Sequence, residues 1–261
     1  MRSVVKVLPL LAVLLLLAQV ALASPQRSRA RNRAHTARAR SIGAPWHGRL
    51  ERGIELRESQ HIRRAGAYAS STHFFGTAEL VHLIERAAAV VARRNPGSKL
   101  TTGELSKHSG GEIDGHGSHE NGRDADLSFY MMDAAGHPYA NPYAFAAFRA
   151  DGHGLGANAG LRFDDARNWD LVSRLVADPE ARVQYIFVAR ALRDRLLNEG
   201  RARHAPMSVL ARAASVLVQP ATGNPHRNHF HVRIYCDPSD RPACVDRAPY
   251  HAWYPGVVPP S

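Results

Sequence analysis

The chain has 261 residues, 44% of them hydrophobic, and its 34 Lys and Arg against 23 Asp and Glu give a formal net charge of +11. This length buries a sizeable core in one domain or two small ones, and the composition excludes disordered, collagen-like and disulfide-dense chains. A charge this high is typical of nucleic-acid-binding proteins, so its distribution along the chain decides whether that class applies.

The first 23 residues have the pattern of a secretory signal peptide. Arg2 and Lys6 precede an apolar stretch over residues 7–20, and a small-x-small tripeptide ends at Ala23. The apolar stretch is short for a bilayer span, which favours cleavage after Ala23 over an uncleaved membrane anchor. We therefore expect an exported, periplasmic protein that has no membrane span after cleavage.

Residues 24–40 form a basic arm with six arginines and no hydrophobic residue larger than alanine. Such a segment cannot join a core, and we expect it to be disordered. It is interpreted either as a solvated linker or as a segment attracted to an anionic envelope polymer. The leader and the arm hold eight basic residues and no acidic one, so residues 41–261 carry only +3. This small excess does not support nucleic-acid binding.

Residues 41–261 are expected to form a single α+β domain. Thr77 has the character of an N-cap, and the helix that follows it is stopped by the Asn-Pro-Gly segment 95–97. A shorter helix is expected around Trp169. A further helix is predicted from Asp178 to Gly200, because Asp-Pro-Glu is typical of a helix start and apolar residues follow at helical spacing.

Segments rich in β-branched and aromatic residues predict strands at 99–105, 124–132, 215–219 and 230–236. In the last strand, alternation places His229 and His231 on one face and Phe230 on the other. The glycine-rich segment 151–160 lacks the dinucleotide-binding spacing and is interpreted as a mobile loop. Helices mixed with short strands and little βαβ alternation favour the α+β class.

The chain has two cysteines, Cys236 and Cys244, which are separated by a proline-containing segment. In an exported protein this pair is expected to form a disulfide that closes a short surface loop. Metal ligation is the weaker alternative, because two thiols without a CxxC pattern make a poor metal site.

Two segments concentrate the residues that can carry chemistry, namely His116, His119 and Asp126 in the first and His226, His229 and His231 in the second. With 15 histidines in the chain, neither H-x-H nor H-x6-D is meaningful alone. Their combination with turn glycines and a strand context indicates a metal site. Two imidazoles and one carboxylate suit Zn²⁺ and leave a fourth position for a water molecule.

These residues lie in segments that resemble a known family. GHGSHENGRDADLSFY and HRNHFHVRIYC are similar to the signature segments of penicillin-insensitive murein endopeptidases. That family belongs with lysostaphin-type peptidases, D-alanyl-D-alanine carboxypeptidases and hedgehog-like domains. SIGAPWHGRL, FGTAELVHLIERA, GELSKHSGG, the Asn168-Trp169 helix and VLVQP also match, so the resemblance covers nearly all of residues 41–247.

The resemblance implies a small antiparallel sheet that bears a zinc site and is flanked by helices, as in hedgehog-like and DD-peptidase-like domains. It assigns His119, Asp126 and His231 as zinc ligands. It also places His116 near the metal. Zn²⁺ would then polarise the scissile carbonyl and activate water.

The resemblance further makes His229 a catalytic residue that assists the water or stabilises the tetrahedral intermediate, and His226 another active-site histidine. No HExxH occurs in the chain, so a neutral His229 is the preferred base and the adjacent Glu120 is expected to point away. Asp165 matches an acidic residue near a second metal in the family. It has no histidine beside it, and a helix N-cap is the preferred interpretation.

The function implied is an exported zinc-dependent DD-endopeptidase that hydrolyses D-alanyl-diaminopimelyl cross-links in peptidoglycan. Penicillin should not inhibit it, because no serine is acylated. The alternatives are a D,D-carboxypeptidase that trims terminal D-alanine, and a non-catalytic wall-binding module. A metal-dependent nuclease is disfavoured, because the second histidine segment leads into a strand rather than a helix.

Overall fold

The computed structural model describes residues 38–141 and 143–257. The signal peptide predicted for residues 1–23, and the predicted arm as far as residue 37, lie outside this part of the chain. The first described strand, β1, begins at Arg40. No helix in the described part combines the length and the apolar character that crossing a bilayer requires.

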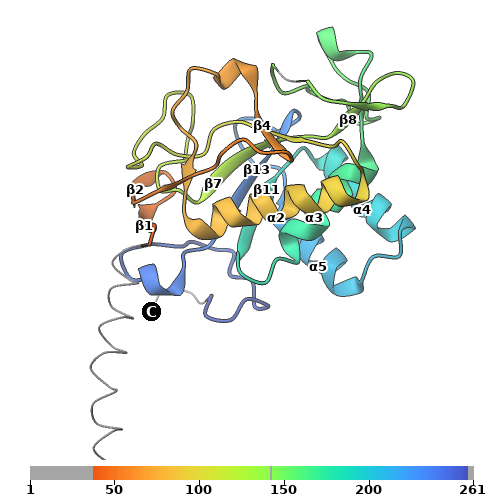
Figure 1. Cartoon of the computed structure of the whole chain (residues 1–261). Helices are drawn as coiled ribbons and strands as arrows, with labels where there is room; N and C mark the ends of the chain where they lie inside the picture. Colours follow the sequence, from red (N-terminus) through yellow and green to blue (C-terminus); the bar gives the residue numbers. More distant parts are fainter. Residues whose placement is uncertain (1–37, 142, 258–261) are drawn as a thin grey trace, which may run out of the picture. The chain divides into compact units, whose positions relative to one another are not determined.

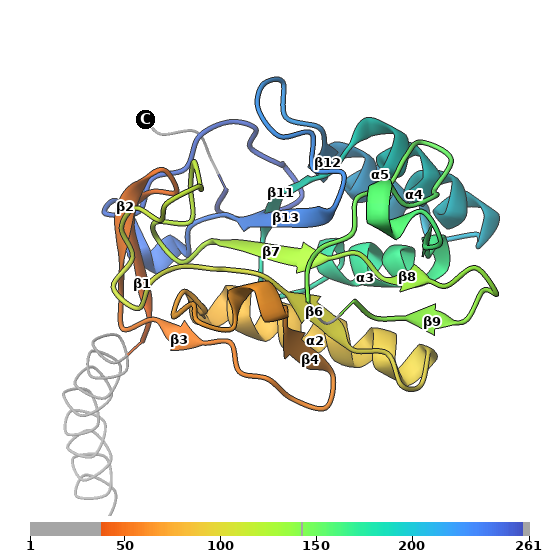
Figure 2. The ribbon, with the colours of Figure 1, turned by 90° about the horizontal axis from the view of Figure 1, so that it is seen from above.

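The central sheet carries the site and has the strand order β12-β11-β13-β7-β6-β4 (Figure 2). Its strands are β4 (Ile62–Arg64), β6 (Leu100–Thr102), β7 (Asp124–Ser128), β11 (Val183–Phe187), β12 (Leu217–Val218) and β13 (His229–Ile234). The middle strands β11, β13, β7 and β6 pair antiparallel, whereas β12 and β4 add at the two edges in parallel. The sheet is therefore mixed, with an antiparallel centre.

Helices gather on one side of this sheet (Figure 1). They are α2 (Ala78–Arg94), α3 (Asp165–Val176), α4 (Arg190–Ala202) and α5 (Met207–Val216). Leu127 of β7 and Phe230 and Val232 of β13 belong to the same buried apolar cluster as Ile84 of α2 and Val172 of α3. The hydrophobic faces of β7 and β13 therefore point toward the helices, and the expected α+β class is confirmed.

Helix α2 forms where capping and periodicity predicted it. The Thr77 hydroxyl accepts a hydrogen bond from the Leu80 N–H at 3.4 Å, and the helix ends at Asn95. Leu80, Ile84 and Val91 are fully buried, so the apolar stripe faces the core. The short helix expected around Trp169 is also confirmed as α3.

The helix predicted from Asp178 to Gly200 is wrong in its first half. The Asp178 carboxylate accepts the N–H groups of Glu180 and Ala181 at 3.0 and 2.9 Å, which makes a turn rather than a helix start. Residues 183–187 (VQYIF) then pair with β13 as strand β11. Aromatic and β-branched residues favour this sheet position over the helix that their spacing alone allowed.

Three predicted strands are clearly shorter than expected. The segment expected at 99–105 is limited to the three residues of β6. The segment expected at 215–219 divides between the last two residues of α5 and the two residues of β12. The segment expected at 124–132 divides into β7 and β8 (Met131–Met132). Segment 151–160 is irregular, as predicted, with a short 3₁₀ turn η2 (Gly156–Asn158).

Smaller elements surround the central sheet. β8 pairs with β9 (Pro138–Tyr139) and β10 (Arg162–Phe163), and β3 (Ile54–Glu55) pairs with β5 (Phe75–Gly76). β1 (Arg40–Ala44) and β2 (His47–Glu51) form a hairpin. The short 3₁₀ helices η1 (Gly66–Tyr68) and η3 (Pro238–Asp240) lie in connecting segments.

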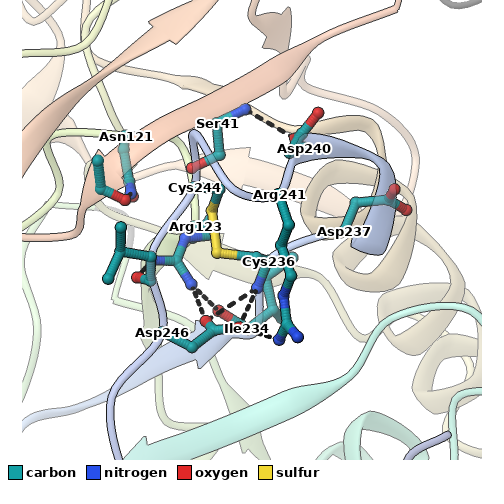
Figure 3. Close-up of a disulfide and its surroundings, with 12 residues drawn as sticks. Ser41, Asn121, Arg123, Ile234, Cys236, Asp237, Asp240, Arg241, Cys244 and Asp246 are labelled. Atoms are coloured by element: carbon teal, nitrogen blue, oxygen red, sulfur yellow. Dashed lines mark hydrogen bonds and ion pairs between the residues drawn. A yellow bond between two sulfur atoms is a disulfide. The ribbon is translucent and has the colours of Figure 1, made fainter. Parts of the chain in front are cut away.

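The predicted disulfide between Cys236 and Cys244 is confirmed (Figure 3). The cysteines themselves are buried, at 0% and 3% exposed, whereas Pro238, Ser239, Pro242 and Ala243 between them are exposed, so the loop lies at the surface as expected. Strand β1 lies along it: the Gly43 N–H donates to the Ala243 carbonyl at 2.8 Å, and the Val245 N–H donates to the Gly43 carbonyl at 3.0 Å. The disulfide segment is therefore part of the fold of the N-terminal hairpin.

A buried ion pair fixes the same segment to the central sheet. The Arg123 guanidinium, just before β7, is 1% exposed and donates to the Asp246 carboxylate at 2.6 Å (Figure 3). It also donates to the carbonyls of Ile234 and Val245 at 3.2 and 3.0 Å. Because the buried charges of Arg123 and Asp246 are paired, the residues after the disulfide are held against β13.

Candidate metal centre

The face of β7 and β13 that points away from the helices carries the polar residues. Asp126 is directly opposite His231, and Asp124 is directly opposite Arg233. His229 is opposite a serine at the next position on this face. Because directly paired residues of an antiparallel sheet share a face, the register alone brings this carboxylate and the imidazoles together.

His116 and His119 reach this face from the segment that precedes β7. His119 adopts a left-handed backbone conformation (φ 77°), and Gly122 (φ 76°) makes the following turn. A non-glycine residue in this region is uncommon and is often found at functional sites. His116, His119 and Asp126 each present a potential ligand atom, and these atoms lie within 4.8 Å of one another.

The orientation of the His119 ring is fixed by a backbone carbonyl. Its Nδ1 donates to the Leu105 carbonyl oxygen at 2.6 Å. A carbonyl only accepts, so Nδ1 carries the proton and Nε2 presents its lone pair. Nε2 lies 3.4 Å from Asp126 Oδ1.

Carboxylates fix the two other rings in the same way. His231 Nε2 donates to Asp124 Oδ1 at 2.8 Å, which leaves Nδ1 at 3.5 Å from Asp126 Oδ1. His116 Nε2 donates to Glu104 Oε2 at 3.0 Å, and its Nδ1 lies 3.9 Å from Asp126 Oδ2. In each ring one nitrogen is tied to an oxygen and the other points to Asp126, which is typical of metal-binding histidines.

The convergent atoms lack partners of their own. His119 Nε2 and Asp126 Oδ1 are buried and have no hydrogen-bond partner among the described residues. Burying such groups without a partner is costly, and two lone pairs that face each other at 3.4 Å cannot satisfy one another. A divalent cation among them would satisfy both, and imidazole with carboxylate is a donor set that suits Zn²⁺. The residues therefore fit the predicted metal.

The electrostatics keep the carboxylates of the site ionised. Burial would raise the pKa of Asp126, but the neighbouring His229 and His119 hold it well below its usual value. Burial would also raise the pKa of Asp124, but the charge of Arg233 and the hydrogen bond and charge of His231 together outweigh this and lower it. For Glu104, hydrogen bonds outweigh burial and lower the pKa to about 2. These groups thus remain available as anionic ligands or ring anchors near neutral pH.

His229 also approaches the Asp126 carboxylate. Its Nε2 is 3.4 Å from Asp126 Oδ1, and its Nδ1 bonds to Asn228 Oδ1 at 2.8 Å. The Phe145 ring lies against the imidazole, with ring centroids 5.3 Å apart. The side chain is therefore held with Nε2 directed into the site.

His226 lies at the edge of the cluster, also with a left-handed backbone (φ 54°). Its Nδ1 donates to the Asn224 carbonyl at 2.7 Å, so Nε2 presents a lone pair. Burial, together with the nearby His229 and His231, lowers the pKa of His226 to about 4. The ring is consequently neutral at pH 7, and its Nε2 can accept a hydrogen bond. The five histidines predicted for the site meet at this face, namely His116, His119, His226, His229 and His231.

Two acidic residues considered from the sequence lie elsewhere. Glu120 points away, as predicted, because its carboxylate accepts the Gly48 N–H at 3.0 Å. The N-cap of α3 is Asp164, so the prediction that Asp165 caps this helix is wrong by one residue. The Asp165 carboxylate instead bonds to Arg195 at 2.9 Å.

The ring anchors Asp124 and Glu104 were not identified from the sequence. Asp124 could have been identified from the sequence, since it precedes Asp126 by two residues and strand alternation places both on one face. Glu104 follows the end of β6 by two residues and also bonds to His73 at 2.9 Å. Nothing local in the sequence indicates that it meets His116, because this contact depends on how the loop before β7 folds back.

The comparisons with known proteins agree with this geometry. The family model of penicillin-insensitive murein endopeptidases matches residues 41–253, a range that includes both histidine segments and the ring anchors. No match was found among curated proteins. The match spans most of the chain, and peptidoglycan is the substrate on which this family acts as a peptidase. The chain therefore belongs to the penicillin-insensitive murein endopeptidase family.

Proposed function

We propose that the protein is an exported, zinc-dependent DD-endopeptidase that hydrolyses D-alanyl-diaminopimelyl cross-links in peptidoglycan and is insensitive to penicillin. One observation carries the zinc dependence. Three imidazoles, each anchored through one nitrogen, direct the other nitrogen at the buried carboxylate of Asp126. This arrangement costs free energy unless a cation occupies it.

In this proposal His119, Asp126 and His231 hold the zinc ion, with His116 close enough to contribute. A bound Zn²⁺ supplies Lewis-acid polarisation of a carbonyl and lowers the pKa of water toward neutrality. Leu105, through its carbonyl, and Asp124 keep the protons of two rings away from the ligand position.

His229 and His226 would handle protons on the substrate side. Both rings are held through Nδ1, which leaves Nε2 as the acceptor. His229 Nε2 is within 3.4 Å of the ligand carboxylate, so it is placed to accept a proton from water and to pass it to the leaving amine. The pKa of His226, lowered to about 4, keeps that ring uncharged beside it.

The proposal of export rests on the leader at residues 1–23 and on the substrate class of the family, because peptidoglycan lies outside the cytoplasmic membrane. Insensitivity to penicillin follows from chemistry that uses water rather than an acylated serine. Periplasmic location is part of the same proposal.

The direct test uses the protein without its leader, residues 24–261, on cross-linked sacculi in the presence of penicillin. We expect wild type to convert dimeric muropeptides into monomers and His119→Ala to leave them intact. EDTA should abolish the cleavage and Zn²⁺ should restore it. Identical muropeptide profiles for the two proteins, or full activity after thorough chelation, would contradict the proposal.

Product analysis also separates the alternatives. A D,D-carboxypeptidase would release free D-alanine from pentapeptides without converting dimers into monomers. A non-catalytic wall-binding module would bind sacculi without turnover. The complete set of inward-facing histidines favours a catalyst over a binding module, since a binding surface has no need of a buried, unpartnered carboxylate oxygen.

A further inference from the structure

A second hollow lies beside the metal centre. It is a cavity of about 240 Å³ between the β1–β2 hairpin, strands β11 and β13, and the segment that follows the disulfide. Trp46, Tyr185 and Phe187 give it aromatic walls, and Arg233 and Arg247 give it positive charge. We call this cavity the arginine groove.

The arginine groove adjoins the metal centre through Phe187. The Phe187 ring lies 5.3 Å from the His231 ring and 5.7 Å from the His226 ring, measured between centroids. Arg233 follows His231 by two residues on the same face of β13, a spacing of about 6.6 Å along a strand. A molecule with its reacting bond at the metal centre can therefore place a neighbouring group in the groove.

Arg233 has N–H groups that take part in no hydrogen bond within the described residues. Its Nε donates to Asp124 at 2.6 Å, whereas its two terminal nitrogens have no hydrogen-bond partner among the described residues. The residue is 9% exposed, and its guanidinium lies within 6 Å of the Trp46 and Phe187 rings, at 5.8 and 5.7 Å from their centroids. A largely buried guanidinium whose terminal N–H groups line a cavity is a site for a planar anion.

Arg247 supplies the second charge. Its guanidinium lies 4.7 Å from the Trp46 ring centroid and has no acidic partner among the described residues. Its backbone is fixed on both sides. Gln184 donates to the Arg247 carbonyl at 2.5 Å, and the preceding Asp246 is held by Arg123 (Figure 3). The groove is thus flanked by two guanidinium groups that face one tryptophan.

We propose that the arginine groove binds the carboxylate on the carbon attached to the scissile nitrogen of the substrate, an inference that rests on the proposed function. That carboxylate is two bonds from the nitrogen that leaves, so it falls within the reach of Arg233 when the scissile carbonyl is at the metal centre. A carboxylate matches the geometry of the guanidinium fork. The aromatic walls would contact the apolar part of the same residue.

Two substrates carry this chemistry. In a D-alanyl-diaminopimelyl cross-link, this carboxylate is on the diaminopimelyl carbon whose amine forms the scissile amide. In a terminal D-alanyl-D-alanine, it is the C-terminal carboxylate of the last D-alanine. Cross-linked dimers and monomeric pentapeptides are therefore assayed side by side, each as the free acid and as the carboxamide at this position. Comparing the acid with the carboxamide for the dimer and for the pentapeptide identifies which of the two carboxylates the groove binds.

The first test compares wild type, Arg247→Gln and a control, Arg49→Gln. Arg49 is an exposed arginine of the same hairpin, 63% exposed at its side chain. Loss of one charge-assisted hydrogen bond should raise KM for the free acid by about tenfold in Arg247→Gln, with kcat nearly unchanged. The carboxamide substrates and Arg49→Gln should show no such change. An equal effect of Arg247→Gln on acid and carboxamide would overturn the inference.

The second test does not need turnover. N-acetyl-D-alanine, which has the carboxylate next to an amide nitrogen, is titrated against the full protein while tryptophan fluorescence is followed, with N-acetyl-D-alaninamide as the comparison. We expect a change with the acid alone, and its loss in both Arg247→Gln and Trp46→Phe. An equal response to acid and amide, or none to either, would overturn the inference.

The two tests separate this inference from the proposed function. If sacculi are not cleaved but N-acetyl-D-alanine still binds in an Arg247-dependent manner, the proposed function fails and the groove stands. If cross-links are cleaved without regard to the carboxylate, the groove fails and the proposed function stands.

Discussion

Replacing Asp124 by asparagine tests whether buried anchors prepare the metal centre. The Asp124 carboxylate is fully buried and accepts hydrogen bonds from His231 Nε2 at 2.8 Å and from Arg233 Nε at 2.6 Å. Its other oxygen faces the His119 N–H at 3.4 Å. Asparagine keeps the shape but removes the charge. Its NH₂ group only donates, so either the His231 ring and Arg233 or the backbone N–H of His119 loses its acceptor.

The expected losses can be estimated. Removing one partner of a buried ion pair costs about 3 kcal/mol, and Arg233 is only 11% exposed at its side chain. For a domain of this size that corresponds to a fall in Tm of roughly 6–12 °C. Loss of a carboxylate that orients a ligand histidine lowers metal affinity by about 10–100-fold.

Two assays measure these effects. Thermal unfolding of the metal-free proteins gives the change in Tm, and competitive Zn²⁺ titration gives the change in affinity. Asp194→Asn, at an exposed aspartate paired with Arg193, is the matched control and should behave as wild type. If Asp124→Asn binds Zn²⁺ as tightly as wild type, the anchoring argument is refuted, even when the protein is less stable.

Three further predictions concern stability and the absence of a role. The double variant Cys236→Ala, Cys244→Ala should lose about 2–3 kcal/mol of unfolding free energy in denaturant titration, since the cross-link closes a short loop; an unchanged midpoint would argue against this. Burial would raise the pKa of Asp178, but hydrogen bonds from Arg86 lower it, so its stabilisation is present above the unfolded pKa and is lost as the pH falls through about 4 toward the folded value. Unfolding free energies between pH 6 and pH 3 should therefore fall more steeply for wild type than for Asp178→Asn, and parallel curves would refute this. Glu120→Gln should keep cleavage within about twofold of wild type, because this carboxylate bonds to the β1–β2 hairpin; a loss of about 10³-fold would make it the general base instead.

The sequence predicted those parts of the fold in which local pattern and tertiary packing agree. Helix α2 has an N-cap, an apolar stripe and a stop signal that all indicate the same boundaries, and they were correct. Strand β13 was predicted because its alternation is strict. Strand β11 was mistaken for helix because its apolar residues also fit a helical spacing, and only pairing with β13 decides between the two.

The same limit applies to the site. The histidines and Asp126 were predicted because they lie in two short segments, and the β7–β13 register brings those segments together. Asp124 and His231 are 107 residues apart, and the arginine groove joins the N-terminal hairpin to the segment after the disulfide. Contacts of this kind depend on the folded arrangement, which local sequence patterns do not encode.

The central claim is that one zinc ion binds among His119, Asp126 and His231. Anomalous diffraction at the zinc edge from crystals of residues 24–261 grown with Zn²⁺ measures this directly. We predict a strong peak in contact with Asp126 Oδ1, His119 Nε2 and His231 Nδ1. The absence of a peak there, or a peak that these three residues do not coordinate, would contradict the account.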